Sequence, residues 1–174
     1  MEPVRIRLED IKGDGLSLEL QLELTDLDTV KLSGPVIIHA KAIRAGKKIR
    51  LRMDLSFTLI LPCSRCLKET EHMFSESEEF IFIRAPAPVV PEQQLEDEDL
   101  VTQFFTGEEI DIAPLIRETI ILSVPIKPLC KPDCKGLCPV CGADRNEEEC
   151  EHGNSESSFD LRWSKLRELR DRKE

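Results

Sequence analysis

The sequence predicts an α+β fold, in which an antiparallel, curved or barrel-like sheet carries a packed helix and a Cys-rich C-terminal segment. Three observations support this class. Residues 16–24 and 49–61 alternate apolar and polar side chains with the period of a half-buried strand. Residues 111–122 place apolar side chains at helical spacing. Five of the seven cysteines lie between residues 130 and 150.

Strands are expected to fill most of the first 83 residues. In residues 16–24 leucine occupies every even position, and a helix would distribute such leucines around its axis instead of placing them on one face. A turn at Ala45-Gly46 joins two apolar runs into a hairpin. The expected strands are residues 4–8, 16–24, 36–43, 49–61 and 69–83.

An acidic connection is expected at residues 85–109. The net charge is −10, and residues 85–125 contribute −8 of it, with one basic and nine acidic groups. The rest of the chain is nearly balanced, so its charge does not exclude nucleic acid. Three prolines and a run of acids in residues 85–100 predict a mobile connection. A helix follows at residues 111–122, with Asp111 as the expected N-cap.

The length of 174 residues fits one domain with a small appendage. We expect a β-rich body at residues 1–125, and a Cys-rich tail with a C-terminal helix, packed on the body, at residues 126–174. No apolar run approaches the ~20 residues of a membrane helix, and the charged start is unlike a signal peptide. These features indicate a cytoplasmic protein, where a reducing environment favours metal binding over disulfides.

The segment Cys138-Pro-Val-Cys141-Gly142 has the sequence of a zinc knuckle. Two thiolates two residues apart on a tight turn can bind one metal ion, and glycine after the second cysteine suits a left-handed backbone position. Cys150 and His152 follow closely and complete a Cys₃His ligand set. This set predicts a tetrahedral zinc site.

A second ligand set combines residues far apart in the chain. Cys63-Ser-Arg-Cys66 lies at the expected bend between two strands, and Cys130 with Cys134 has no other partners. Pairing them gives a Cys₄ set that leaves no cysteine unused. The sequence therefore predicts two structural Zn²⁺ ions, with the tail folded back on the bend.

Other chemistries fit the cysteines less well. A disulfide framework is one alternative, and a zinc-dependent redox or chaperone protein using the CxxC motifs is another. A nucleobase deaminase would need an H-x-E motif beside its P-C-x-x-C motif, and none of His39, His72 and His152 has glutamate two residues later. Because four protein ligands close the coordination sphere of zinc, we expect no enzymatic activity and no catalytic residues.

Three segments carry a family resemblance. They are the motif Cys63-Ser-Arg-Cys66-Leu67, the segment from Ile110 to Glu118 that leads to Val124-Pro125, and the segment from Cys130 to Cys141 with its Gly-Leu-Cys-Pro-Val-Cys-Gly core. With Asn146 and Cys150, they resemble the YceD-like family, the large ribosomal RNA subunit accumulation proteins. His152 stands where many relatives have cysteine. The resemblance implies a bacterial cytosolic protein, without enzymatic activity, that is needed for normal large-subunit ribosomal RNA levels.

The resemblance also implies partners: large-subunit ribosomal RNA or its assembly intermediates, and ribosomal proteins, with no membrane and no small-molecule substrate. Residues 41–52 contain six basic side chains and no acidic one. These candidate RNA contacts are Lys41, Arg44, Lys47, Lys48, Arg50 and Arg52. We expect phosphate contacts of low sequence specificity, with no aromatic side chain nearby for base stacking.

For both charged segments an interpretation without a binding role stays open. The basic hairpin could be an edge kept soluble by its charges. The acidic connection at residues 85–109 could be a solvated spacer, or it could imitate nucleic-acid charge and bind a basic ribosomal protein.

Overall fold

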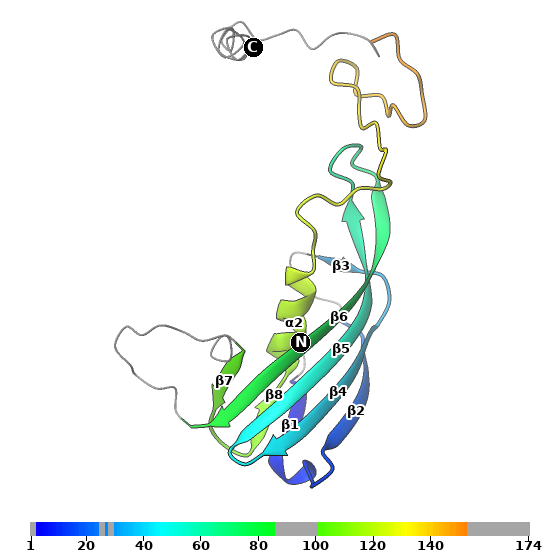
Figure 1. The fold of residues 1–174 in the computed structure, drawn as a ribbon. Coiled ribbons are helices and arrows are strands. Elements are labelled where there is room, and N and C mark those ends of the chain that lie inside the picture. Colours follow the sequence, from blue (N-terminus) through cyan, green and yellow to red (C-terminus); the bar gives the residue numbers. More distant parts are fainter. Residues whose placement is uncertain (1–2, 25–26, 28–29, 86–100, 153–174) are drawn as a thin grey trace, which may run out of the picture.

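A computed structural model describes residues 3–24, 27, 30–85 and 101–152 (Figure 1). In these residues a six-stranded sheet forms most of the body. A two-stranded sheet and one α-helix, α2 (Ala113–Leu122), complete it. The C-terminal helix expected around Trp163 lies outside the described residues.

The large sheet is mixed. Its strands follow the order β2 (Leu16–Leu22), β4 (Val36–Ala45), β5 (Lys48–Pro62), β6 (Glu69–Arg84) and β7 (Thr102–Phe105), and β3 (Lys31–Leu32) pairs with β5. All neighbours are antiparallel except β6 and β7, which are parallel. The expected strands are therefore present, but the purely antiparallel sheet is wrong at one edge.

The barrel-like closure that we expected is also wrong. Within the described residues β2 and β7 occupy opposite edges of an open sheet. The physical reason is that a second layer already covers the apolar face. This layer contains α2 and the two-stranded sheet of β1 (Arg5–Arg7) and β8 (Glu109–Asp111), which lie on the same side of the large sheet (Figure 1).

Part of the expected acidic connection, residues 85–109, forms strands of the body. Residues 86–100 lie outside the described part of the chain, but β7 and the start of β8 fall within the 85–109 segment. The side chains of Arg84 and Glu108 form an ion pair across this region. The end of the segment therefore belongs to the folded body.

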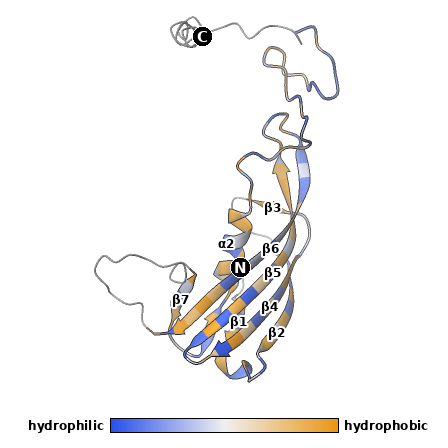
Figure 2. Ribbon diagram, viewed as in Figure 1, coloured by the Kyte–Doolittle hydropathy of each residue, from blue (hydrophilic) through white to orange (hydrophobic). Residues whose placement is uncertain are grey.

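The core follows from the alternation of β5. Buried residues alternate with more exposed ones along β5, and the ribbon in Figure 2 alternates between hydrophobic and hydrophilic colours along this strand. The buried set is Ile49, Leu51, Met53, Leu55, Phe57, Leu59 and Leu61. From α2 and its N-cap, the core receives Ile112, Leu115, Ile116 and Ile120. Because successive strand residues face opposite sides, the intervening residues of β5 form an outward face.

The helix begins two residues later than expected. Ile112 is its N-cap, whereas Asp111 lies one position earlier. The Asp111 carboxylate nevertheless accepts hydrogen bonds from the N–H groups of Ala113, at 3.0 Å, and Val4, at 3.2 Å. It thereby joins the helix start to the N-terminal segment, which continues through β1 into the 3₁₀ turn η1 (Leu8–Asp10). None of the helices in the described residues has the length and hydropathy of a membrane span.

The packing of α2 on the sheet can be tested by a matched pair of substitutions. Ile116 is fully buried, whereas Leu122 of the same helix is 75% exposed. We expect Ile116→Ala to lower the free energy of unfolding by about 2–5 kcal/mol, because it leaves a cavity between helix and sheet. Leu122→Ala should change it by no more than about 0.5 kcal/mol. Urea unfolding of both variants measures the difference, and equal effects would contradict this packing.

Candidate metal centres and a basic surface

The first CxxC motif forms the turn between β5 and β6. The Cys63 N–H donates to the Lys68 carbonyl at 3.0 Å, and the Leu67 N–H donates to the Cys63 carbonyl at 2.9 Å. Leu67 has a positive φ of 62°, which few residues other than glycine adopt. This tight turn lets Cys63 and Cys66 contribute ligand atoms to one group.

The tail brings two more cysteines to this turn. The Sγ atoms of Cys63 and Cys134 are 3.7 Å apart, and those of Cys66 and Cys130 are 3.6 Å apart. All four sulfurs lie within 4.8 Å of one another. Tetrahedral Zn–S bonds of ~2.3 Å would place sulfurs about 3.8 Å apart. The structure thus brings together the Cys₄ set that the sequence paired, in a geometry that could hold a metal ion.

Backbone contacts attach the tail to the turn independently of the sulfurs. The Ser64 N–H donates to the Pro128 carbonyl at 2.8 Å, and the Leu137 N–H donates to the Arg65 carbonyl at 3.1 Å. The Arg65 guanidinium donates to the Cys134 carbonyl at 2.6 Å. These bonds fix both sides of the Cys₄ group, and the role of Arg65 is one that sequence reasoning missed.

Asn146 and Asp144 support the Cys₄ group from the tail. The Asn146 Nδ2 donates to Cys134 Sγ at 3.4 Å, and its Oδ1 accepts the Lys135 N–H at 2.9 Å. The Asp144 carboxylate accepts the Asn146 Nδ2 at 2.6 Å, and its hydrogen bonds from the Asn146 backbone N–H and side chain lower the pKa of Asp144. Supporting groups of this kind orient metal ligands. Asn146 carried part of the family resemblance, but no sequence signal pointed to Asp144.

The second group is formed by neighbouring parts of the tail. Cys138, Cys141, Cys150 and His152 have ligand atoms within 4.8 Å of one another. The Gly142 N–H donates to the Cys138 carbonyl at 2.9 Å, and Gly142 has the left-handed φ, 75°, that its position in the knuckle predicted. Cys138 is buried, whereas Cys141 and His152 are exposed. This group could also hold a metal ion, in a more open setting than the first.

The sulfurs differ in their acidity. Burial raises the pKa of Cys63, but the backbone N–H groups of Cys66 and Cys130 help to outweigh it, and the pKa is lowered to about 6. Burial and the neighbouring sulfurs raise the pKa of Cys130 to about 12. In the second group, the N–H of Cys141 is the main reason why the pKa of Cys138 falls to about 6. Cys63 and Cys138 therefore ionise more readily than Cys130, and a bound cation would favour the thiolate form of Cys130 as well.

The structure places the six candidate RNA contacts at the end of the β4–β5 hairpin. Lys41 lies opposite Arg52 in the strand register, and Lys48, Arg50 and Arg52 share the outward side of β5. Arg44 of β4 lies opposite the buried Ile49 in the strand register, so it is on the core-facing side of the sheet. It lies near the end of β4, where its side chain is exposed. Five of the six side chains are exposed, and Lys48 is half-buried.

Two acidic side chains adjoin this patch. Glu79 of β6 lies 3.9 Å from Arg50, and Asp54 lies 3.4 Å from Arg52. Hydrogen bonds from Ser77 and the nearby Arg52 lower the pKa of Asp54. Glu79 is far from the basic residues in sequence, and only the pairing of β5 with β6 places it beside them. The surface patch therefore carries less net positive charge than residues 41–52 alone indicated.

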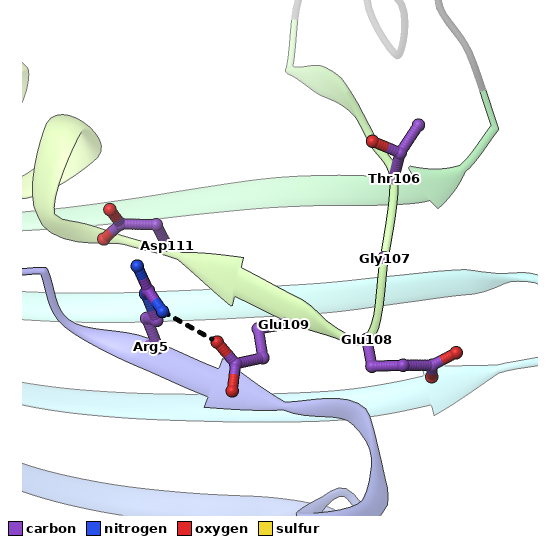
Figure 3. A pocket seen from close by; sticks show the side chains of 6 residues that line it. All are labelled: Arg5, Thr106, Gly107, Glu108, Glu109 and Asp111. Carbon is purple, nitrogen blue, oxygen red and sulfur yellow. Dashed lines mark hydrogen bonds and ion pairs between the residues drawn. The ribbon is translucent and has the colours of Figure 1, made fainter.

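A surface cavity of about 460 Å³ lies beside β1 and β8 (Figure 3). Its lining residues are Arg5, Thr106, Gly107, Glu108, Glu109 and Asp111. The Arg5 guanidinium pairs with Glu109 at 3.2 Å, as Figure 3 shows. Glu108 pairs with Arg84, and Asp111 accepts the backbone bonds described above. The carboxylates of this cavity thus have protein partners already.

The fold and the two ligand groups define a class of protein: an open β-sheet body whose longest hairpin binds a Cys-rich tail. The chain belongs to the YceD family, because residues 51–170 match the family described as large ribosomal RNA subunit accumulation protein YceD. This confirms the resemblance that the cysteine motifs indicated.

Relatives occur in plants and bacteria. The chloroplastic "Large ribosomal RNA subunit accumulation protein YCED homolog 1" of Arabidopsis thaliana is 28% identical over 153 residues, which cover 70% of this chain and 45% of the plant protein. An uncharacterized protein of Mycobacterium tuberculosis is 33% identical over 167 residues, covering 96% and 69%. The uncharacterized protein YlbN of Bacillus subtilis is 29% identical over 124 residues, covering 70% and 68%. No solved structure matches the chain.

Two glycines of the tail offer a test of the fold-back. Gly136 has φ 73°, and a Cβ there would lie 3.0 Å from the Arg65 carbonyl oxygen, whereas Gly142 has φ 75° and open space around it. Gly142→Ala should cost about 1–2 kcal/mol of backbone strain. Gly136→Ala should lower the free energy of unfolding by about 2–5 kcal/mol, because the backbone strain and the clash of the new Cβ with the β5–β6 turn add. Thermal unfolding and metal content measure both, and equal losses would contradict the docking of Gly136 on Arg65.

Proposed function

We propose that this chain is a non-enzymatic, zinc-stabilised, cytoplasmic factor that supports large-subunit ribosomal RNA accumulation and ribosome assembly. It acts by binding RNA, ribosomal proteins or both. The observation that carries the proposal is the convergence of the tail and the β5–β6 turn on one Cys₄ group, in a chain of the YceD family.

The donor sets support zinc as the metal. Each group offers four protein ligands, either four thiolates or three thiolates and an imidazole, and these are the sets of structural zinc sites. N–H groups of Arg65 and Asn146 donate to Cys63 and Cys134, which helps to stabilise thiolate charge. All seven cysteines lie in the described residues and none forms a disulfide. Four protein ligands leave no open position for a substrate, so the role is structural.

The basic end of the β4–β5 hairpin supports RNA as a partner. Six basic side chains and only two carboxylates lie there, and the ion pairs of Arg50 with Glu79 and of Arg52 with Asp54 are solvent-exposed. Exposed pairs contribute only about 0–1 kcal/mol, so an arginine can exchange its carboxylate for a phosphate at little cost.

Metal analysis tests the structural role. We expect two zinc ions per chain, one for each group, after purification under reducing conditions. Cys63→Ser should lose the first ion and lower the melting temperature strongly, because it also releases the tail from the β5–β6 turn. Cys141→Ser should lose only the second ion. Native mass spectrometry counts the ions. A metal-free protein that cycles between dithiol and disulfide would instead favour the redox alternative.

Charge reversal tests the RNA surface. Lys41, Arg44 and Lys47 make no ion pair with other described residues, so changing all three to Glu should leave the fold intact. RNA affinity should fall, and the slope of log affinity against log salt should flatten by about 2 for three lost phosphate contacts on single strands.

The matched control reverses Lys31, Lys127 and Lys135, which are exposed and lie beside the other end of β5 or in the tail. Filter binding to large-subunit ribosomal RNA over a salt series measures both variants. Equal behaviour of the two variants would remove the hairpin as the binding surface, and unchanged assembly activity in both would leave a ribosomal protein as the partner.

A further inference from the structure

An aromatic side chain lies on the same face of the sheet as the basic hairpin. In the strand register Lys48 of β5 lies opposite Ile83 of β6, and Ile83 lies beside Phe104 of β7. Paired residues in neighbouring strands point to the same side of a sheet. Phe104 therefore belongs to the outward face that carries Arg50 and Arg52. Sequence reasoning expected no aromatic side chain here, because 54 residues separate Phe104 from Arg50.

The next residue of β7 confirms this orientation independently. The ring of Phe105 meets that of Phe82 edge to face, with centroids 6.2 Å apart, and it packs on the core. Because adjacent strand residues face opposite sides, Phe104 faces away from the core. It is 40% exposed. On β4, which adjoins β5 on the side away from β7, Ile43 lies opposite Arg50 and is 42% exposed.

We propose that this face is a platform for single-stranded RNA, in which the ring of Phe104 stacks on a base while Lys41, Arg50 and Arg52 hold phosphates. The inference rests on the proposed function and adds the conformation of the RNA that is bound. β7 adds the stacking residue to the basic patch, so the outward faces of β4, β5 and β7 form one site.

The spacing and chemistry of the face favour RNA. β5 and β7 are separated by two interstrand distances, or roughly 10 Å, so one short segment of RNA can reach both. Exposed aromatic rings beside a positively charged track are the usual elements of single-strand recognition, since every base has a face that stacks. Bases inside a duplex are already stacked and cannot use the ring. Acidic peptides satisfy the cations but gain little from an aromatic ring.

The experiment measures binding of metal-loaded full-length protein to a labelled single-stranded oligouridine and to duplex RNA of equal length. Phe104→Leu keeps an apolar side chain but removes the ring, and it should weaken single-strand binding about 5- to 150-fold. Phe104→Trp should retain binding. The salt slope of Phe104→Leu should equal that of the parent, because no phosphate contact is lost. The control is Met73→Ala, since Met73 is 88% exposed on the outward side of β6 but lies far along the strand from the patch.

The outcomes separate this inference from the proposed function. Loss of RNA binding on charge reversal, with parental affinity in a folded Phe104→Leu variant, overturns the stacking role but keeps the basic surface. Equal affinity of the parent for single-stranded and duplex RNA also overturns it. Binding to polyglutamate but not to RNA, with the same dependence on Phe104, overturns the RNA platform in favour of a protein partner. Circular dichroism verifies that each variant is folded.

Discussion

The structure depends on the contact between the β5–β6 turn and the tail, which is centred on the 3.7 Å approach of Cys63 and Cys134. Four sulfurs packed so closely repel one another once they are ionised, and only a cation can hold all of them as thiolates. The hydrogen bonds of Ser64, Arg65 and Leu137 position the chain around this point. The described part of the tail has few buried apolar side chains, so a bound metal ion would take the place of a hydrophobic core there.

Much of the fold could be predicted because its signals are local. The alternation in β5 covers the whole strand, and each buried residue faces the core as its position predicted. The open sheet and the parallel β7 could not be predicted in this way. β7 has four residues, too few for a clear period, and its pairing with β6 is a contact between distant segments. Closure was expected because the sequence does not show that α2 and the β1–β8 pair cover the apolar face.

The ligand groups were easier to predict than their surroundings. Cysteine would have few uses in the reducing compartment that we expected, so counting ligands in fours was enough to pair Cys63 with a tail more than sixty residues away. The supporting contacts of Arg65 and Asp144 go largely to backbone groups, which any residue possesses, and they leave no mark in the sequence. Likewise Glu79 and Phe104 enter the outward face only through strand register.

The separation of the ligands along the chain has a consequence for how the protein is made. The second group needs only residues 138–152, whereas the first must wait until residue 134 has been synthesised, long after its partner at residue 63. Closing the longer loop also costs roughly 1.5 kcal/mol more chain entropy. A nascent chain therefore exposes the β5–β6 turn with two unpaired thiols until the tail arrives. An ion could bind the first group only after residue 134 has been made, and products truncated before it would retain an open turn.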